Sequence, residues 1–368
     1  MEERYLKIST GEDLGVTFGT FHSFFYAILR ELPQFRDLAV ADRKDQLLAL
    51  KRGMIRKFGK SVYTNDLLSL VLDDIGRCKN GMGPKLSETK DLYSVYNEEM
   101  KKSGLLDYDD MLLMAYREME KNRRLLNDLR DRYSYFLIDE FQDINRVQYM
   151  AVRLMAFPRN NLFCVGDDDQ SIYGFRGSDP AIMRIMPKEL PDTRIIELTV
   201  NYRSTENIVF VTGKLIRNNR NHYPKHAEAF CKEGERPVMA KFRTPAEEAA
   251  YIAEKVKGSS DERSFAVLGR TNRAVNDIRD MIPETLRERI SFHTFHTSKG
   301  LEFDTVFVAA CNEEVTPGQR YEGEAELEEE RRTFYVAATR AKKKLYFLFT
   351  EYYKDKESPP SRFLKELL

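Results

Sequence analysis

The chain has 368 residues, of which 42% are hydrophobic and 32% are charged, and this length suits two or three domains with real cores. Basic and acidic side chains balance to a formal net charge of zero, so nucleic-acid binding cannot be argued from bulk charge and would need local patches. The four cysteines form no CxxC pair, which argues against a zinc site or a disulfide framework and fits a reducing cytosol.

The sequence gives no sign of a membrane contact. No apolar run approaches the roughly 20 residues needed to span a bilayer, and the N-terminal stretch MEERYLKISTGEDLG lacks the apolar core of a signal peptide. We therefore expect a cytoplasmic protein with no membrane partner.

The N-terminal third predicts mainly helices. Residues 16–18 read as a short strand, and Thr20 is a plausible N-cap of the helix that follows. The apolar residues of that helix share one face: Phe21, Phe24, Phe25, Ile28 and Leu29. From about Leu32 to Ser103 the pattern is helical and highly charged, with almost no strand signal. We expect a helical subdomain inserted in a sheet domain.

From Tyr133 onward, short apolar strands alternate with amphipathic helices. The predicted strands are YFLI (135–138), NLFCV (161–165), RIIELTV (194–200), FAVLGR (265–270), TVFVAA (305–310) and KLYFLFT (344–350). The clearest helices are PAEEAAYIAEKV and ELEEERRTFYVAATRAKKK. This alternation implies parallel sheets covered by helices, and so many strands fit two α/β domains with a boundary between Pro180 and Pro191.

Two strand ends carry polar clusters. YFLIDEFQD ends in Asp139 and Glu140, which could hold magnesium beside a nucleotide, although strand tips are often acidic because they are solvated. VGDDDQSIYGFRGS (165–178) adds an amide, Gln170, and the aromatic residues Tyr173 and Phe175. The amide could sense a γ-phosphate, and each aromatic could stack on a base for roughly 1–3 kcal/mol. The alternative is a tight turn with core aromatics.

Two further stretches lie near the C-terminus. HTFHTSKGLEFDTVFV (293–308) places His296 on a loop, where Gly300 would let the backbone approach closely, and Glu302 just before a strand. EEERRTFYVAATRA (328–341) leaves Arg340 at the margin of an apolar stripe, a place usually held by a surface charge. That stripe has helical spacing: Leu327, Phe334, Ala338, Ala341 and Leu345. We read the acidic stretch 313–330 as a solvated loop.

These four stretches, with GTFHS (19–23), LTVNYRST (198–205) and LLDYDDML (105–112), resemble the ordered motif series of UvrD/Rep/PcrA-type superfamily 1 DNA helicases. The resemblance covers most of the chain and implies an α/β fold of the P-loop NTPase type, with two RecA-like parallel-sheet domains that clamp ATP. Residues 1–31 and 104–185 would form an incomplete first domain, 32–103 its helical insertion, and 186–368 the second domain, with no large insertion.

The resemblance also implies roles for single residues. Asp139 would bind Mg²⁺, Glu140 would activate water, and Arg340 would act as an arginine finger, worth roughly 10³–10⁵ in rate. The other expected nucleotide contacts are Gln170, Arg203, Gly300 and Glu302. The expected DNA contacts are Thr20, His22, Tyr173, Phe175, Arg176 and His296. The implied partners are single-stranded DNA and DNA junctions, with 3′-to-5′ movement.

One family motif is missing from the sequence. Helicases of this type carry a Walker A loop, GxxxxGK[ST], whose backbone and lysine bind phosphates. The nearest match here, Gly53 with Gly59–Lys60–Ser61, has the wrong spacing and follows a helical segment, so we read it as a helix end.

We therefore expect the sequence to start after the Walker A loop, the first domain to be loosely folded unless an N-terminal segment or a partner fills the slot, and ATP turnover by these residues alone to be negligible. The competing hypothesis is a non-hydrolysing, helicase-derived DNA-binding or regulatory module. That hypothesis predicts drift in the catalytic residues, yet those outside the phosphate loop are all present: Asp139, Glu140, Gln170, Arg203 and Arg340.

Overall fold

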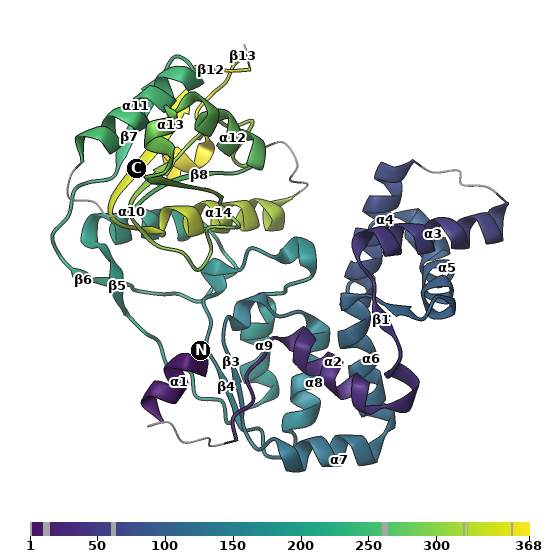
Figure 1. Cartoon of the computed structure of the whole chain (residues 1–368). Coiled ribbons are helices and arrows are strands. Elements are labelled where there is room, and N and C mark those ends of the chain that lie inside the picture. Colours follow the sequence, from purple (N-terminus) through teal and green to yellow (C-terminus); the bar gives the residue numbers. More distant parts are fainter. Residues whose placement is uncertain are drawn as a thin grey trace. The chain divides into compact units, whose positions relative to one another are not determined.

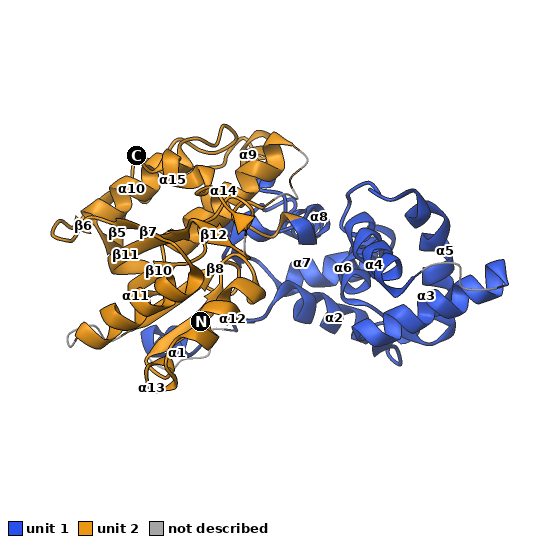
Figure 2. Cartoon of the chain, turned by 90° about the horizontal axis from the view of Figure 1, so that it is seen from above, with its two compact units in different colours: residues 1–166, 175–182 blue, residues 167–174, 183–368 orange. Residues whose placement is uncertain are grey.

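The computed structural model describes residues 2–9, 15–59, 64–259, 264–318, 321, 323–354 and 356–368. Its contacts divide the chain into two compact units (Figure 2). Unit 1 contains residues 1–166 and 175–182, and unit 2 contains residues 167–174 and 183–368. The loop 167–174 thus belongs to unit 2, although both of its flanks belong to unit 1.

Unit 1 is mostly helical (Figure 1). Its helices are α1 (Glu2–Ile8), α2 (Phe21–Glu31), α3 (Arg43–Phe58), α4 (Asn65–Lys79), α5 (Ser87–Lys102), α6 (Tyr108–Lys121), α7 (Arg123–Arg132) and α8 (Arg146–Ala156), with 3-10 turns η1 (Pro33–Phe35) and η2 (Phe141–Asp143). Helices α3, α4 and α5 share a core around Leu50, Val71 and Tyr96. The expected run of helices is confirmed, flanked by the short parallel pair β1 (Ala39–Val40) and β2 (Leu105–Leu106).

Two local predictions in this region have different outcomes. Thr20 does cap α2, because its Oγ1 accepts a hydrogen bond from the N–H of Ser23 at 3.2 Å. Residues 16–18 are not a strand. A strand needs a neighbouring strand to pair its backbone groups, and none of the described strands pairs with residues 16–18.

The near match to a phosphate loop is a helix and its end. Gly53 lies inside α3, where an added Cβ would come within 2.5 Å of Val95 Cγ1. Gly59 follows the last turn with a left-handed φ of 79°, the usual glycine at a helix C-terminus. Lys60 and Ser61 lie outside the described residues.

The sheet of unit 1 is small. β3 (Phe136–Ile138) and β4 (Leu162–Cys164) pair in parallel, with Leu137 opposite Phe163, and among the described residues they pair only with each other. One face is open: Leu137 is 74% exposed and Phe163 61%. Tyr135 and Val165, at the same alternation, extend this exposed apolar face.

Unit 2 is built on a five-stranded parallel sheet with strand order β7-β11-β10-β8-β9. Its strands are β7 (Val238–Phe242), β8 (Phe265–Gly269), β9 (Ile290–Thr294), β10 (Phe303–Val308) and β11 (Ala341–Thr350). A separate parallel pair joins β5 (Val200–Thr205) to β6 (Glu228–Cys231), and a short antiparallel pair joins β12 (Tyr352–Tyr353) to β13 (Lys356–Glu357).

Helices cover both faces of this sheet (Figure 1). α10 (Glu206–Ile216), α14 (Glu324–Ala338) and α15 (Arg362–Glu366) pack on one face. α11 (Pro245–Gly258) and α12 (Asn272–Met281), followed by α13 (Glu284–Arg287), pack on the other. Successive residues of β8 alternate between the two cores, as a strand buried on both faces must. The α/β class with parallel sheets is confirmed.

Several expected boundaries in unit 2 are wrong. The predicted helix 326–344 ends at Ala338, and Ala341 and Leu345 belong to β11 instead of a helical stripe. Pairing of β11 with both β10 and β7 overrides the local helical pattern. The strand expected at 194–200 starts only at Val200, and we missed β6, β7 and β9. The acidic stretch is not all solvated loop, because it includes the first half of α14, where Glu328 is buried.

α9 (Ala181–Glu189) begins in unit 1 and continues into unit 2. Two 3-10 turns, η3 (Asp168–Gln170) and η4 (Gly174–Arg176), lie just before it. Across the described ranges, no helix combines the length and the apolar character needed to cross a bilayer.

Candidate functional site

In unit 1, the acidic pair lies at the carboxyl end of β3, as expected. Asp139 and Glu140 are both exposed. Glu140 has a left-handed φ of 51°, and its N–H donates to Asp139 Oδ1 at 3.0 Å. Non-glycine residues in this conformation cluster at functional sites. The neighbouring tip of β4 approaches closely, since a Cβ on Gly166 would lie 2.7 Å from Gln142 Oε1.

In unit 2, four stretches far apart in sequence converge through hydrogen bonds. Lys299 Nζ donates to Gln170 O at 2.8 Å. Arg340 Nη1 donates to Leu301 O at 3.4 Å. These bonds join the loop 167–174 to the segment 293–302 and to the end of α14.

The fourth stretch joins through β5. Ser204 Oγ donates to Ala341 O at 2.6 Å. Arg203 Nε lies 3.2 Å from Glu302 Oε2, and Lys342 Nζ lies 2.5 Å from Glu302 Oε1. Lys342, followed by Arg203, contributes to holding the pKa of the Glu302 carboxyl below its usual range. The result is one polar cluster in which Gln170, Arg203 and Glu302 come together with several cations.

Arg340 is placed differently from our expectation. We expected this side chain at the margin of the apolar stripe, but it is 1% exposed. Its Nε donates to Val336 O at 2.8 Å, and its Nη2 lies 3.4 Å from Gln170 Oε1. α14 ends at Ala338 and β11 begins at Ala341, and Arg340 lies in the turn between them, with its side chain directed inward toward Gln170.

Gly300 has a positive φ of 81°, yet an added Cβ would meet nothing within 4 Å. We expected this glycine to allow a close approach of the backbone. The structure indicates that its role is the left-handed conformation, which other residues adopt at a cost.

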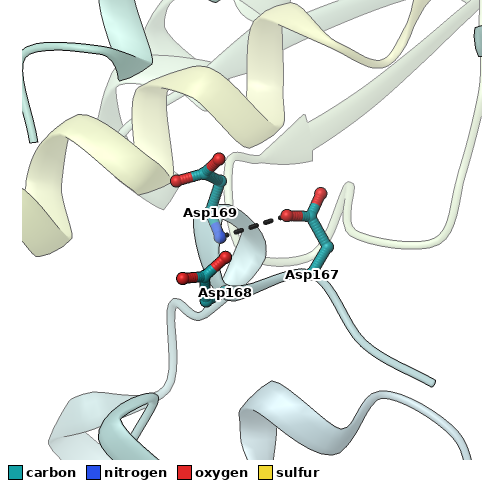
Figure 3. A group of neighbouring side chains, drawn as sticks. All are labelled: Asp167, Asp168 and Asp169. Atoms are coloured by element: carbon teal, nitrogen blue, oxygen red, sulfur yellow. Dashed lines mark hydrogen bonds between the residues drawn. The ribbon is translucent and has the colours of Figure 1, made fainter. Parts of the chain in front are cut away.

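The acidic run Asp167–Asp169 forms a compact carboxylate cluster (Figure 3). Lys225 Nζ lies among the three carboxylates, 3.0 Å from Asp169 Oδ2, and ion pairs with Asp167 and Asp168 as well. His222 Nδ1 lies 3.1 Å from Asp169 Oδ1.

Burial raises the pKa of Asp169 to about 6, and Lys225 counteracts this shift. The lysine already supplies the positive charge that a metal ion would bring, so the cluster is better described as an ion-pair anchor for the loop.

Of the expected DNA contacts, two lie together in unit 2. The rings of Tyr173 and His296 have centroids 6.3 Å apart, and Lys299 Nζ lies 5.2 Å from the Tyr173 ring centroid. An aromatic pair beside a lysine offers a surface on which a base can stack and a phosphate can be neutralised.

The remaining expected DNA contacts lie in unit 1. Phe175 and Arg176 are exposed, with the guanidinium carbon 5.4 Å from the phenyl centroid. Thr20 caps α2, and His22 in its first turn packs edge-on against Tyr108 at 5.6 Å. Burial lowers the pKa of His22. A neutral imidazole there would donate a hydrogen bond to a phosphate but would not add charge.

Sequence reasoning missed the residues that hold the loop 167–174. Lys225 lies in a segment with no recognisable motif, so only the structure identifies its role in holding the loop. Glu329 and Arg332 lie in the EEERRTF stretch, where a charged cluster beside an apolar helical stripe was readable as a buried polar network.

Comparison with known proteins gives a consistent result. The sequence model of the UvrD/REP helicase N-terminal domain matches residues 1–191, and that of the UvrD-like helicase C-terminal domain matches residues 196–286 and 276–352. YjcD of Bacillus subtilis is 36% identical over 273 residues, which cover 69% of this chain and 35% of YjcD.

Two other similar proteins are also named as DNA helicases. DNA helicase II of Rickettsia typhi is 35% identical over 261 residues, 65% of this chain and 39% of that protein. The ATP-dependent DNA helicase Rep of Buchnera aphidicola is 29% identical over 314 residues, 78% of this chain and 48% of that protein. The chain thus spans less than half of each of these three relatives. Because the two domain models of one family match it in order, the chain belongs to the UvrD/Rep family of DNA helicases.

Proposed function

We propose that this chain is the motor part of an ATP-dependent DNA helicase or translocase that moves 3′-to-5′ along single-stranded DNA. The observation that carries the proposal is the convergence in unit 2 of the loop 167–174, β5, the segment 293–302 and the end of α14. This convergence supports the proposal because it brings together an amide, an arginine and a carboxylate from family motifs that lie far apart in sequence.

In this proposal, the polar cluster of unit 2 contacts ATP. Gln170 and Arg203 contact the γ-phosphate, and Glu302 contacts the ribose with Gly300 beside it. Arg340 supplies positive charge to the transition state. Its bond to Gln170 supports this role, because the two groups would then respond to the same phosphate.

In the same proposal, Asp139 and Glu140 of unit 1 supply the acidic groups needed for ATP hydrolysis. The exposed carboxylate of Asp139 is an oxygen ligand of the kind that Mg²⁺ takes in proteins. When bound, Mg²⁺ neutralises charge on the transferred phosphate. Glu140 accepts a proton from the attacking water. Gln142 Nε2 donates a hydrogen bond to the Glu140 carboxylate and so orients that carboxylate.

For DNA, we propose that Tyr173, Phe175 and His296 stack on bases while Thr20, His22 and Arg176 contact the backbone. Single-stranded DNA and DNA junctions are the proposed partners. Binding should weaken as salt rises, because phosphate contacts release counterions. Phe175→Ala should lower the affinity without changing the salt slope, and an unchanged affinity would remove the stacking role.

The phosphate-binding loop is proposed to come from an N-terminal segment or from a partner. Support comes from the open apolar face of the β3–β4 pair, with Leu137 and Phe163 exposed, since sheets of this class are covered on both faces. Residues 1–368 by themselves should therefore turn over little ATP.

An ATPase assay with and without single-stranded DNA tests the proposal. The 368-residue chain should show negligible turnover, and adding a segment that carries GxxxxGK[ST] should produce turnover that DNA stimulates and Glu140→Gln abolishes. DNA-stimulated, Glu140-dependent turnover by the chain alone would refute the need for that segment. No turnover in either form would favour a non-hydrolysing DNA-binding module.

A further inference from the structure

Helix α14 holds the second half of the loop 167–174 at two points. Arg332 Nε donates to Ser171 O at 2.8 Å, and both residues are buried. Glu329 Oε1 accepts a hydrogen bond from the N–H of Gly174 at 2.8 Å. Ser171 and Gly174 bracket Ile172 and Tyr173, so the two contacts fix the backbone on both sides of the tyrosine.

The second contact requires a close approach. A Cβ on Gly174 would lie 2.5 Å from Glu329 Oε2, closer than any real side chain permits. Burial lowers the pKa of Arg332 and raises that of Glu329. Charged groups are rarely buried unless their hydrogen bonds compensate for lost hydration, and here those bonds go to the loop.

The first half of the loop also packs against α14, but it has additional anchors from other segments. Lys225 pairs with Asp167, Asp168 and Asp169, and Lys299 binds the carbonyl of Gln170. Loss of an α14 contact should therefore release the region around Tyr173 and leave the acidic cluster in place.

We propose that Arg332 and Glu329 are positioning residues that fix the loop 167–174, so that Tyr173 and Gln170 are presented together to DNA and nucleotide; what the loop contacts rests on the function proposed above. Neither residue touches the proposed ligands in this arrangement. α14 therefore links the loop to Arg340, because Arg340 follows the last turn of the helix that holds the loop.

Hydrogen exchange of the 368-residue chain tests the attachment directly. Arg332→Gln and Glu329→Ala should speed exchange of the Gly174 amide by at least about tenfold, because an opening that costs about 1.4 kcal/mol less is ten times more populated. The matched control is Arg331→Gln on the same helix. Arg331 is also buried, but it pairs with Glu366 and Asn219 rather than with the loop.

Three results decide the outcome of the exchange experiment. Faster loop exchange in the two test variants alone supports the proposal. Equal acceleration in the control would mean that α14 is simply destabilised, and no acceleration in any variant would mean that the loop is held elsewhere. Either of these two results overturns it.

DNA binding distinguishes positioning from general stability. With a labelled oligo-dT probe, Arg332→Gln should weaken binding at least about fivefold, the low end for one aromatic stack. In a Tyr173→Ala background the same change should have no further effect, and Arg332→Lys should restore part of the affinity. An equal loss in both backgrounds would contradict positioning through Tyr173. If the unmodified chain binds no DNA, the proposed function fails while the exchange result still decides the attachment.

Discussion

Two pairs of short apolar parallel strands have opposite surroundings in this molecule: β8 with β10 in unit 2, and β3 with β4 in unit 1. In unit 2, the residues Phe265–Leu268 of β8 are each at most 3% exposed, between helices on both faces. In unit 1, Leu137 of β3 is 74% exposed and Phe163 of β4 is 61% exposed. An apolar strand pattern therefore indicates that a sheet face can be buried, but the neighbouring helices and strands decide whether that face is buried.

The largest expected difference between the two pairs is in hydrogen exchange. Amides of β8 and β10 should open only with global unfolding, whereas amides of β3 and β4 should exchange on the order of a thousandfold faster or more. Exchange measured by mass spectrometry on the isolated chain tests this. Strong protection of β3 and β4 would mean that their open face is covered in solution, and the comparison would fail.

A matched pair of phenylalanines sharpens the comparison. Phe347→Ala removes a fully buried ring stacked on Phe334 at 5.5 Å, so the free energy of unfolding should fall by about 3–5 kcal/mol. Phe163→Ala should cost under about 1 kcal/mol, because that ring is mostly in water already. Urea denaturation followed by circular dichroism measures both. Similar losses for the two variants would show that Phe163 is packed against something.

Unit 1 also contains a well-packed region with a buried ion-pair cluster. The difference in burial between the two units is therefore limited to the β3–β4 sheet. Lys79 Nζ lies 2.7 Å from both Asp107 Oδ2 and Asp110 Oδ1, and its side chain is 0% exposed. Lys79→Met should destabilise unit 1 by about 3–5 kcal/mol, because two buried carboxylates lose their partner. As a control, Arg132→Ala breaks an exposed pair with Glu31 and should cost under about 1 kcal/mol. A mild effect of Lys79→Met in urea denaturation would mean that unit 1 is loose throughout.

One carboxyl group in unit 2, that of Glu248, should make the free energy of unfolding depend on pH. Burial raises the pKa of Glu248 to about 7, against the opposing effect of its bond from the Ala310 N–H. The folded state then holds a proton that the unfolded state loses near pH 4.5. The stability from this group is therefore full below that pH, falls as pH rises to 7, and is constant above.

Glu248→Gln should remove this dependence, which amounts to roughly 3 kcal/mol across the window. Urea denaturation of the two proteins at pH 5 and pH 8 gives the difference directly. Parallel pH profiles for the wild-type protein and the variant would show that Glu248 is charged throughout.

Much of the fold was readable from local pattern. The strands at 135–138, 161–165, 265–270 and 305–310 were predicted within one or two residues, because each is a short apolar run between turn signals. The end of α14 was not readable, because Ala341 and Leu345 continue a helical spacing but are taken into β11. The site followed the same rule: motif residues were identifiable, whereas Lys225 and the inward turn of Arg340 were not.

The sequence by itself determined the α/β class, the Thr20 cap and the family motifs, since these depend on residue type and spacing along the chain. Only the tertiary structure decided which unit carries the loop 167–174, which cations hold it and which apolar strand faces stay open. The reason is that burial and ion pairing are properties of contacts between segments distant in sequence, and local spacing carries no information about which segments will meet.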